Sequence, residues 1–572
     1  MRRLLPVLLL GVFAGACSEP GALIQPGESP CRGDVTPITA VQGDGYQSPL
    51  VDTVVTVRGV VTRVDAGKGF YLESIGFRGD TRASKAIFIA DSDLPGSAWT
   101  GRQLEISGRV TELGTSRDTL TSLTEIASHK ACTERPELPL TQAALPLDSP
   151  AREALEGMRI SLQQPLTVTD VYQLARGALT LSSADVLRVP TEVANPGSAA
   201  QDRERTNRRH TIVTVLPEAP APLPVGSSTQ AVAGVMGHNG RGQQLLLDDA
   251  PAFTVPSMHT LEPAAAGRIR MVSSNLLNFF NGDGRGGGFP TERGAETPDE
   301  LAAQSARIKA VMTRIRPDLV AVQELENDGF GPDSAAQSLL ALLNETGNTD
   351  WAFITPGAGR IGEDVITVGL FYRQKVLEAV GQPHVLGSGP FRGLSRQPLA
   401  QLFRDKQTGK TFLVASNHLK SKGSCPEDGP NSNQKDGQGC WNPARVAAVK
   451  AQLPWLRQLA EQAGSGRLLI LGDMNAWRNE DPIRQFNGAG YIDLVEKMAG
   501  LPQHSFLYWG QTGTLDYAFA SPALAGLARY AVNWHINADW PREMTQSEPW
   551  LRASDHDPVI VDFDFSQPVT SD

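Results

Sequence analysis

At 572 residues the chain is longer than a single compact domain ordinarily is, and its length favours three or four domains. Hydrophobic residues make up 40% and charged residues 20%, as in ordinary soluble globular proteins, while 56 Gly and 40 Pro favour β-rich parts joined by loops. The net charge of −10 argues against a protein that coats nucleic acid through bulk positive charge. It does not exclude an enzyme that acts on a polyanion, because bound cations and local basic residues can carry the substrate contacts.

Residues 1–17 have the features of an export signal. Two arginines open the chain, a short apolar stretch extends to Phe13, and small residues then lead to Cys17. Small residues ending in Cys resemble a bacterial lipobox, so we expect a lipoprotein signal, lipidation of Cys17 and a polar tether over residues 18–36. A plain secretory signal cleaved near Ala16 is the alternative. The expected location is the bacterial cell envelope, on a membrane or the cell surface through the lipid anchor, or outside the cell if the protein is released.

Cysteine usage agrees with export. Setting Cys17 aside leaves an even number of cysteines, which suits disulfide bonds in an oxidising compartment. Their positions suggest two bonds, Cys31–Cys132 and Cys425–Cys440. The alternatives are free thiols or a metal site, and the lack of a Cys-x-x-Cys pair disfavours zinc.

Period-two patterning predicts a β module over residues 37–135. Val57–Val64 and Ile106–Leu113 both follow the pattern apolar-x-Gly-x-Val-Thr-x-apolar, which indicates half-buried strands with Gly at a bend or bulge. We therefore expect a small barrel of the oligonucleotide-binding (OB) type.

Residues 136–258 are expected to form a second β-rich module. Its strand candidates are Met158–Leu162, Thr211–Val215 and Gln243–Leu247. The charged stretch Asp202–Arg209 lies between them and is interpreted as a surface loop, with a nucleic-acid contact as the alternative.

The pattern changes after Arg268. Strand-like runs alternate with two segments of helical spacing, over 308–315 and 446–459, the second with a kink or break expected at Pro454. Helices mixed with many strands in such a length predict an α/β sandwich.

Short motifs with acidic, amide or imidazole groups follow the strand-like runs. Glu324 comes first, and four motifs follow it: Asn417-His418, Gly472-Asp473-Met474-Asn475, Leu515-Asp516-Tyr517 and Ser554-Asp555-His556. Side chains at strand ends can converge on one mouth of a sheet. A hard divalent cation needs oxygen ligands, and hydrolysis of a phosphate ester needs proton donors and acceptors beside it. The set therefore predicts a metal-dependent phosphodiesterase in the C-terminal half.

Taken in order with Asn275, these motifs resemble the endonuclease/exonuclease/phosphatase superfamily, which includes DNase I, over roughly residues 268–566. Within it, the stretches Asn275–Asn281, Glu324–Gly329, Asn417–Gly423 and Asp436–Asn442 are similar to the ExeM/NucH-type extracellular nucleases, which carry OB-like modules ahead of the catalytic domain. The resemblance implies an α/β catalytic domain, with two packed, mostly antiparallel sheets flanked by helices and the site at one edge, preceded by all-β OB-like modules.

The resemblance also implies the metal ligands. Asn275, Glu324 and Asp555 would hold a divalent cation, with Mg²⁺ expected first and Ca²⁺ or Mn²⁺ as alternatives.

The catalytic roles implied by the resemblance fall on His418, Asp473, Asn475, Asp516 and His556. His556 would act near the attacking water and Asp516 would orient it, while His418 would contact the scissile phosphate. Asp473 and Asn475 would position the nucleophile and stabilise charge on the phosphoryl oxygens. Arg396, Lys420 and Lys422 are candidate phosphate contacts, because a chain of net negative charge needs local positive potential to admit a polyanion.

The expected function is therefore that of an exported, metal-dependent nuclease acting on DNA, with RNA as a further substrate. The alternatives are another phosphoesterase of the same superfamily, such as a phosphoinositide phosphatase or a sphingomyelinase, and a protein whose OB-like modules bind nucleic acid or glycans without catalysis. Because every catalytic motif follows Arg268, a fragment covering 262–572 is expected to keep much of its turnover on short oligonucleotides.

Overall fold

The computed structural model describes residues 30–75, 82–91, 97–115, 118–240, 242–258, 260–357, 359–500, 503–542 and 548–567. The export signal and Cys17 lie outside the described residues. The chain separates into two compact units. The first consists mainly of residues up to 141, and the second contains 161–234 together with 244–572. Among the described residues, no helix has both the length and the apolar character needed to cross a membrane.

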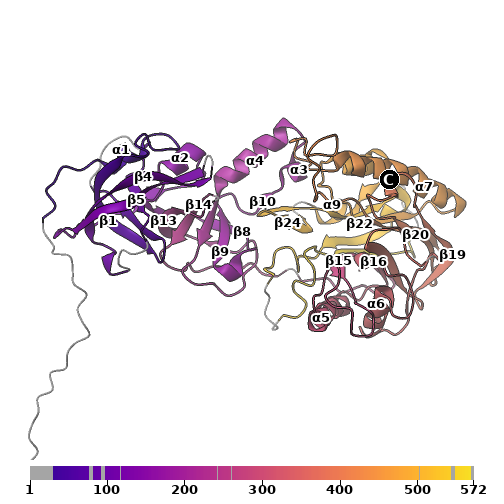
Figure 1. Ribbon diagram of the computed structural model, residues 1–572. Helices are drawn as coiled ribbons and strands as arrows, with labels where there is room; N and C mark the ends of the chain where they lie inside the picture. Colours follow the sequence, from indigo (N-terminus) through magenta and orange to yellow (C-terminus); the bar gives the residue numbers. More distant parts are fainter. Residues whose placement is uncertain are drawn as a thin grey trace, which may run out of the picture. The chain divides into compact units, whose positions relative to one another are not determined.

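The first unit contains a closed five-stranded barrel (Figure 1). Its strands pair in the order β1-β2-β3-β5-β4, and they are β1 Val54–Asp65, β2 Gly69–Glu73, β3 Ala86–Ile89, β4 Gln103–Thr115 and β5 Asp118–Ala131. A Cβ at Gly59 would lie 2.8 Å from the carbonyl oxygen of Glu73, and one at Gly108 would lie 2.9 Å from that of Thr124. The two glycines of the repeated pattern thus allow close approach between strands. The OB-like character of the barrel stays a prediction.

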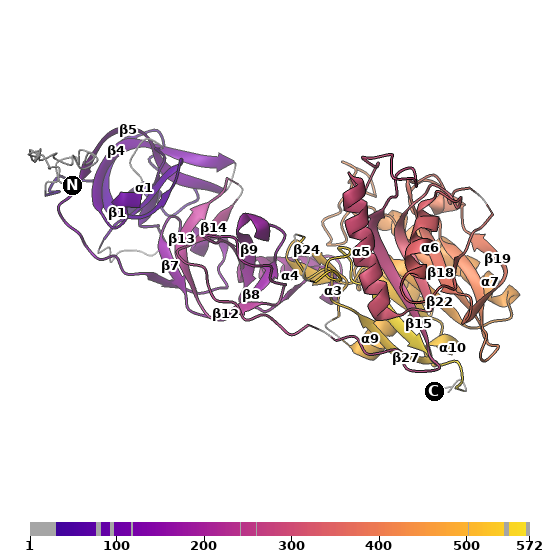
Figure 2. The ribbon, with the colours of Figure 1, turned by 90° about the horizontal axis from the view of Figure 1, so that it is seen from below.

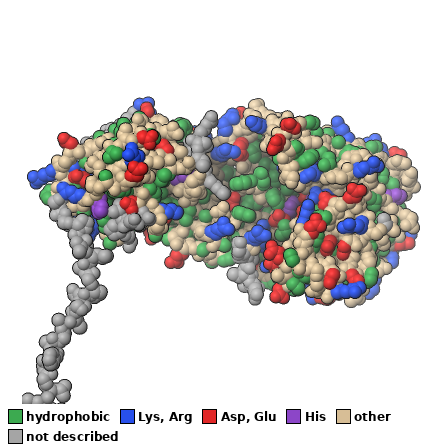
Figure 3. Space-filling model, in the orientation of Figure 1, with side chains coloured by type: hydrophobic (Ala, Val, Ile, Leu, Met, Phe, Trp, Pro, Cys, Tyr) green, Lys and Arg blue, Asp and Glu red, His purple; other side chains and the backbone are tan. Residues whose placement is uncertain are grey.

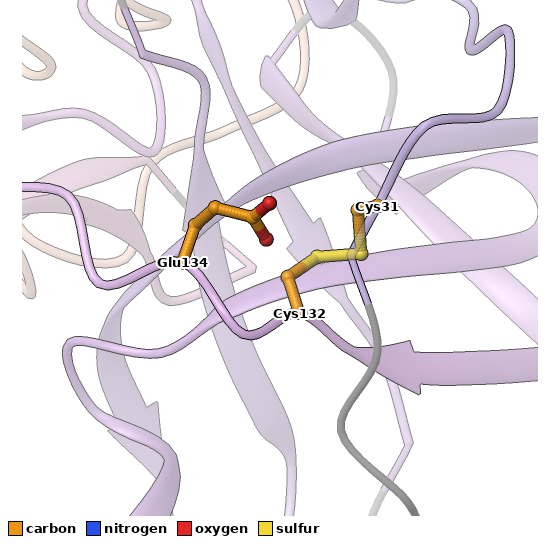
Figure 4. A group of neighbouring side chains, drawn as sticks. All are labelled: Cys31, Cys132 and Glu134. Carbon is orange, nitrogen blue, oxygen red and sulfur yellow. A yellow bond between two sulfur atoms is a disulfide. The ribbon is translucent and has the colours of Figure 1, made fainter.

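The disulfide Cys31–Cys132 joins the start of the described chain to the residue that follows β5, with the two Cα atoms 5.3 Å apart. Figure 4 shows the side chain of Glu134 beside the bond. Both sulfur atoms are consumed in the bond, so the group of two cysteines and Glu134 does not offer thiolates to a metal. The second predicted bond, Cys425–Cys440, is also present, so both pairings are confirmed.

The second unit begins with a β-rich part. Strand β9 (Ala178–Ser182) pairs antiparallel with β8 (Leu166–Asp170) and with β11 (Thr211–Val215). Several other short elements precede residue 268, and some of them belong to the first unit. They are α1 Ile38–Gln42, η1 Ser97–Trp99, β6 Thr141–Ala143, α2 Ser149–Glu153, β7 Arg159–Leu162, η2 Leu174–Arg176, β10 Leu187–Arg188, α3 Pro190–Val193, β12 Ser228–Thr229, β13 Val232–His238 and β14 Gln243–Leu247. The three strands predicted between 158 and 247 are therefore confirmed.

The charged stretch interpreted as a surface loop is instead part of helix α4, Ser198–His210. Its charges alternate in sign at helical spacing: Arg208 pairs with Glu204 four residues earlier, and Arg205 pairs with Asp202 three residues earlier. Such pairs stabilise an exposed helix that has little apolar surface of its own. The loop prediction was therefore wrong: the segment is helical although it has little apolar surface.

The catalytic part is a sandwich of two six-stranded mixed sheets (Figure 1). The first has the order β17-β18-β16-β15-β28-β27, with β15 Ile269–Phe279, β16 Leu319–Glu326, β17 Trp351–Phe353, β18 Ile366–Arg373, β27 Ala528–Asn533 and β28 Val559–Phe563. The second has the order β19-β20-β21-β22-β26-β23, with β19 Leu377–Val385, β20 Leu399–Asp405, β21 Thr411–His418, β22 Leu468–Asp473, β23 Ile492–Asp493 and β26 Asp516–Ala520. Apolar residues of both sheets form one continuous buried core between them.

Helices cover the outer faces of the sandwich (Figure 2). α5 (Pro298–Ile315) and α6 (Ala335–Asn344) pack on the first sheet, and α7 (Asn442–Gln462) and α8 (Asp481–Gly488) pack on the second. α7 continues through Pro454, so no break occurs there. The smaller elements are η3 Gly389–Phe391, α9 Leu494–Ala499, β24 Phe506–Tyr508, β25 Gln511–Gly513 and α10 Pro522–Ala525. The predicted α/β sandwich is confirmed as a mixed-sheet domain.

Candidate active site

Three neighbouring strands bring three of the predicted catalytic residues side by side. His418 ends β21 and is paired in register with Asp473, which ends the parallel strand β22. Asp473 is in turn paired with Asp516, which begins the antiparallel strand β26. A Cβ at Gly472 would lie 2.1 Å from the carbonyl oxygen of Asn417, so only glycine allows these strands to meet here. Strand register therefore brings these three residues together.

His556 is bonded to the first residue of β26. Its Nδ1 lies 2.7 Å from Oδ2 of Asp516, and the same carboxylate oxygen accepts a hydrogen bond of 2.7 Å from Ser505 Oγ. Burial opposes a charge on the imidazole, but the carboxylates of Asp516 and Asp473 outweigh it and raise the pKa of His556 well above its ordinary value. The contact through Nδ1 leaves Nε2 as the ring nitrogen for proton exchange with substrate or water.

His418 lies in a different electrostatic setting. Its Nε2 is 3.4 Å from Oδ2 of Asp473 and 3.4 Å from Nη1 of Arg396. Burial and the positive charge of Arg396 lower the pKa of His418 well below its ordinary value, so the imidazole is neutral at pH 7. The surroundings therefore favour a neutral His418 and a protonated His556.

Asp473 is buried and is held by hydrogen bonds from Asn475. Its carboxylate accepts a hydrogen bond of 2.8 Å from the backbone N–H of Asn475 and one of 3.0 Å from the side-chain amide of the same residue. Burial, reinforced by the charge of Asp516 and opposed by that of His556, raises the pKa of Asp473 to about 7. Asn475 has a φ of 48°, so its amide is held toward Asp473 by an unusual backbone conformation.

Glu324 lies within β16, where the regular pairing of the first sheet is interrupted. It has a φ of 60°, and the register of β16 against β18 shifts between Val322 and Leu325. The Glu324 carboxylate accepts hydrogen bonds from the side-chain amide of Asn275, at 3.2 Å, and from the backbone N–H of Asn278, at 3.0 Å. A β-bulge thus breaks the in-and-out alternation of side chains along β16 and redirects the side chain of Glu324.

The donor set around Glu324 fits a hard divalent cation. Burial and the nearby charge of Asp555 raise the pKa of Glu324, so a cation between the two carboxylates would relieve their repulsion. Oδ1 of Asn278 is buried, and no described group donates a hydrogen bond to it. Asn275 presents its amide nitrogen to Glu324. Its side-chain oxygen would face a cation beside the Glu324 carboxylate only after a flip of the amide group. These oxygen donors come from residues close in space, and they match the ligand chemistry of Mg²⁺ or Ca²⁺.

The three predicted phosphate-binding cations differ in their surroundings. Arg396 pairs with Asp364 at 3.0 Å and also contacts His418, so it belongs to the site. Nζ of Lys420 lies over the ring of Trp441, 5.0 Å from its centroid. Lys422 is 2.7 Å from the buried carboxylate of Glu480. Its ammonium is thus already committed to an ion pair, and its contact with phosphate stays a prediction.

The structure also adds residues that the sequence patterns did not single out. Ser505 donates to Asp516 and accepts hydrogen bonds from the backbone N–H groups of residues 515 and 516. The ring of Phe506 lies 4.6 Å from that of His556, centroid to centroid. Arg293 is exposed, and its charge contributes to the lowered pKa of His418. No motif spacing marks these positions, because Ser505 and Arg293 reach the site from loops and Phe506 from the short strand β24.

A second histidine-containing group lies beside the site. His504 Nε2 is 2.8 Å from Asp539, and the rings of His504 and His535 stack at 4.0 Å. They line a cavity of about 340 Å³. His504 is therefore a buried, ion-paired residue of the domain.

The comparisons with known proteins agree with this geometry. Residues 272–556 match the model of the Endonuclease/Exonuclease/phosphatase family. None of the curated proteins matches the chain.

Several solved structures are similar to it. The human Nocturnin catalytic domain with bound sulfate anion is 17% identical, with 53% of this chain and 96% of that chain covered and a TM-score of 0.36. An endonuclease/exonuclease/phosphatase from Bacteroides vulgatus is 16% identical, with 52% and 98% covered and a TM-score of 0.36. TDP2 from D. rerio complexed with single strand DNA product is 13% identical, with 52% and 98% covered and a TM-score of 0.32.

The matched segment extends from β15 to the imidazole of His556 and so includes every motif that meets at the strand edges. Members of this family are typically dependent on divalent metals, which agrees with the oxygen donors around Glu324. Residues 272–556 therefore form an endonuclease/exonuclease/phosphatase domain, with the activity of a phosphoesterase.

Proposed function

We propose that this chain is an exported nuclease that depends on a divalent metal and hydrolyses phosphodiester bonds of DNA, with RNA as a further substrate. The observation that carries the proposal is the His556–Asp516 pair at 2.7 Å, at the same strand edge as Asp473 and His418. It supplies a proton-transfer group of fixed orientation beside a carboxylate whose pKa burial raises to about 7. A phosphodiester needs such groups on both sides of the phosphorus atom, for the attacking water and for the leaving oxygen.

Each residue of the site has a part in this reaction. Asp516 fixes the tautomer of His556 through Nδ1, so that Nε2 can hold a proton at the phosphate. Asp473, oriented by Asn475, would hold the attacking water and accept its proton. Neutral His418 and the guanidinium of Arg396 would contact the phosphoryl oxygens.

The metal would be held by Glu324, with Asn275 and Asp555 beside it. When bound, it supplies Lewis-acid stabilisation of charge on a phosphoryl oxygen. Without a cation, the two carboxylates repel each other, which is consistent with the raised pKa of Glu324.

The choice of a nuclease over other phosphoesterases is supported by the motif stretches that resemble ExeM/NucH-type extracellular nucleases, and by the β modules that precede the domain. A phosphoinositide phosphatase or a sphingomyelinase remains the alternative. Export is supported by the two disulfide bonds, because such bonds persist in oxidising compartments. Lipidation of Cys17 is part of the proposal and can be checked by the mass of the mature N-terminal peptide.

The surface charge on one face of the protein is consistent with substrate binding through Lys and Arg side chains at the active site. On the face shown in Figure 3, Lys and Arg side chains alternate with Asp and Glu side chains, and no broad basic surface is present among the residues described there.

The experiment is an assay of the purified chain, residues 18–572, on supercoiled plasmid, linear DNA, RNA, phosphoinositides and sphingomyelin. Each substrate is incubated with Mg²⁺, Ca²⁺, Mn²⁺ or chelator. The proposal expects cleavage of nucleic acid that stops with chelator. Release of lipid headgroups with intact nucleic acid would assign the domain to the alternative class.

A further inference from the structure

The hairpin formed by β24 and β25 carries a tryptophan at its tip. Tyr508 pairs with Gln511, so the turn consists of only Trp509 and Gly510. Both residues have positive φ, 51° and 72°, as a type I′ turn requires. Asn or Asp before Gly is the ordinary choice at such a turn, because a bulky side chain is rarely found at positive φ. The presence of Trp509 therefore costs conformational energy.

Packing does not compensate for this cost. Trp509 is 81% exposed, the highest value among the described large hydrophobic side chains, and its ring makes an edge contact with the ring of Tyr508, itself 51% exposed. Strained backbone and exposed aromatic surface at the same residue indicate a role in binding rather than in stability.

Aromatic rings connect the hairpin tip to the catalytic histidine. The ring of Phe506 lies 4.6 Å from that of His556, and the ring of Trp477 lies 6.4 Å from Phe506 and 6.4 Å from Tyr508. Tyr508 is followed by Trp509, at 6.4 Å. Trp477 is buried, so a bound strand would instead follow the half-buried Phe506 and the exposed Tyr508, which lie on one face of β24, toward Trp509.

A third exposed aromatic side chain comes from the β-rich part that precedes the domain. Tyr172 is 70% exposed and donates its backbone N–H to Asp170 at 2.8 Å. The hairpin turn lies against the same aspartate, because a Cβ at Gly510 would be 3.2 Å from Cβ of Asp170. Tyr172 and the turn therefore share Asp170 as a neighbour, which places a third exposed aromatic residue near the hairpin turn.

We propose that Trp509, with Tyr508 and Tyr172, forms a stacking platform for unpaired bases of the strand whose phosphate is bound at His556. The inference rests on the proposed function and assigns it a substrate class, single-stranded nucleic acid or the unpaired end of a duplex. Every base has a flat π-face, so aromatic rings bind a single strand independently of its sequence. Stacking also needs no positive charge, which suits a chain of net charge −10.

The platform consists of separate aromatic rings, on the hairpin and on a neighbouring loop. It is not a continuous apolar groove. A folded protein partner buries a contiguous patch, whereas successive bases are flat and spaced along a strand. The half-buried ring of Phe506, which lies beside His556, further favours the strand already held at the active site.

The test uses Trp509→Asn, which keeps the turn geometry and removes the ring. Binding of the full chain is measured in chelator by fluorescence anisotropy, with a labelled oligothymidylate of about 12 nucleotides and an abasic strand of equal length. We expect Trp509→Asn to weaken oligothymidylate binding roughly 5- to 100-fold, to leave abasic-strand binding unchanged, and to leave the melting temperature equal or higher. Trp509→Phe should restore binding to within about threefold. Tyr46→Ala, which removes an exposed aromatic ring of the first unit, is the matched control.

Unchanged oligothymidylate binding by Trp509→Asn, or an equal loss on the abasic strand, would overturn the platform. Cleavage of oligothymidylate by the wild-type chain with Mg²⁺ distinguishes a failure of the platform from a failure of the proposed function. If the wild type cleaves and Trp509→Asn binds normally, only the platform is wrong. If the wild type cleaves no nucleic acid under any metal, the proposed function itself is wrong.

Discussion

The carboxylate of Glu192 accepts hydrogen bonds from the backbone N–H of Arg478, at 3.3 Å, and from its Nε, at 3.2 Å, and both side chains are buried. The same carboxylate accepts hydrogen bonds from the backbone N–H and Oγ1 of Thr514, at 3.1 and 2.9 Å. Arg478 follows Asp473 on its loop, and Thr514 lies just before Asp516. Glu192 belongs to α3, outside the family match, yet it holds both of the loops that carry catalytic acids.

This arrangement argues against the expectation that the fragment 262–572 is self-sufficient. Thr191 also donates a hydrogen bond to Glu480, and β10 pairs in parallel with β25. Removing the preceding residues would leave Arg478 without its Glu192 partner and the hairpin without its neighbouring strand. We now expect the fragment to lose stability and turnover on short as well as long substrates.

Glu192→Ala tests this connection directly. The change leaves Arg478 with the carboxylates of Asp493 and Glu496 and the hydroxyl of Thr514, in a buried position. Loss of one member of a buried ion pair ordinarily costs about 3–5 kcal/mol, so we expect a clearly lower melting temperature and reduced nuclease turnover. Glu378→Ala removes a partner of Arg404 at the surface and should cost under about 1 kcal/mol. Equal melting temperatures for the two variants would show that the Glu192 contact does not stabilise the domain.

The His556–Asp516 pair predicts a pH dependence of stability. The pKa of His556 is raised in the folded state, so the folded state keeps its proton after the unfolded state has lost it. The stabilisation is therefore fully present below the ordinary pKa of 6.5 and is lost as the pH rises through the folded value. Asp516→Asn should remove this contribution. In chelator, its melting temperature relative to wild type should be lowest below pH 6.5 and should approach wild type at alkaline pH; a constant difference would contradict the assignment.

Both histidines should be needed for turnover. His418→Ala and His556→Ala should each lower kcat by about 10²- to 10⁴-fold, as expected for groups that transfer protons or contact the phosphate. The double variant should be little worse than either single one, because groups that act as a unit are not additive.

The control for this series has to be an exposed histidine. His504 is unsuitable, because it is buried and pairs with Asp539. His384, exposed on β19, is the better choice, and His384→Ala should keep wild-type turnover. Full activity in either active-site single variant would remove that residue from the reaction.

The bond between Cys425 and Cys440 should stabilise the loop that precedes α7. Its cysteines are 15 residues apart, and closing a loop of that length removes roughly 3 kcal/mol of unfolded-chain entropy. The loop also positions Gln438, which bonds Asp481 at the start of α8. The variant with both cysteines changed to Ser should melt at a lower temperature with its catalytic residues unchanged, and alkylation of both thiols in the exported protein would refute the bond.

Much of the fold could be predicted from local patterns. Strands such as β21 and β22 have apolar runs that end in polar motifs, and parallel neighbours place such ends together. His418 and Asp473 could therefore be predicted as site candidates from the sequence, because each is a polar residue at the end of an apolar strand. The α5 helix was found because its apolar residues recur at helical spacing.

Other features have no local signature. The φ of 60° at Glu324 arises from pairing with two neighbouring strands, and sequence reasoning placed the residue at a strand end. The partners Glu192 and Arg478 are far apart in sequence, and neither belongs to a motif. The type I′ turn at Trp509 lacks the Asn-Gly signature by which such turns are recognised.

The most direct measurement is the rate of plasmid and oligonucleotide cleavage by wild type and Glu324→Gln as Mg²⁺ is titrated. Glu326→Gln is the matched control, because Glu326 lies on the same strand and accepts a hydrogen bond from the backbone N–H of Asn281. The account predicts cleavage by wild type and Glu326→Gln that ceases in chelator, and a loss on the order of 10³-fold or more in Glu324→Gln with an unchanged fold. Wild-type cleavage at full rate in chelator, or wild-type rates in Glu324→Gln, would contradict it.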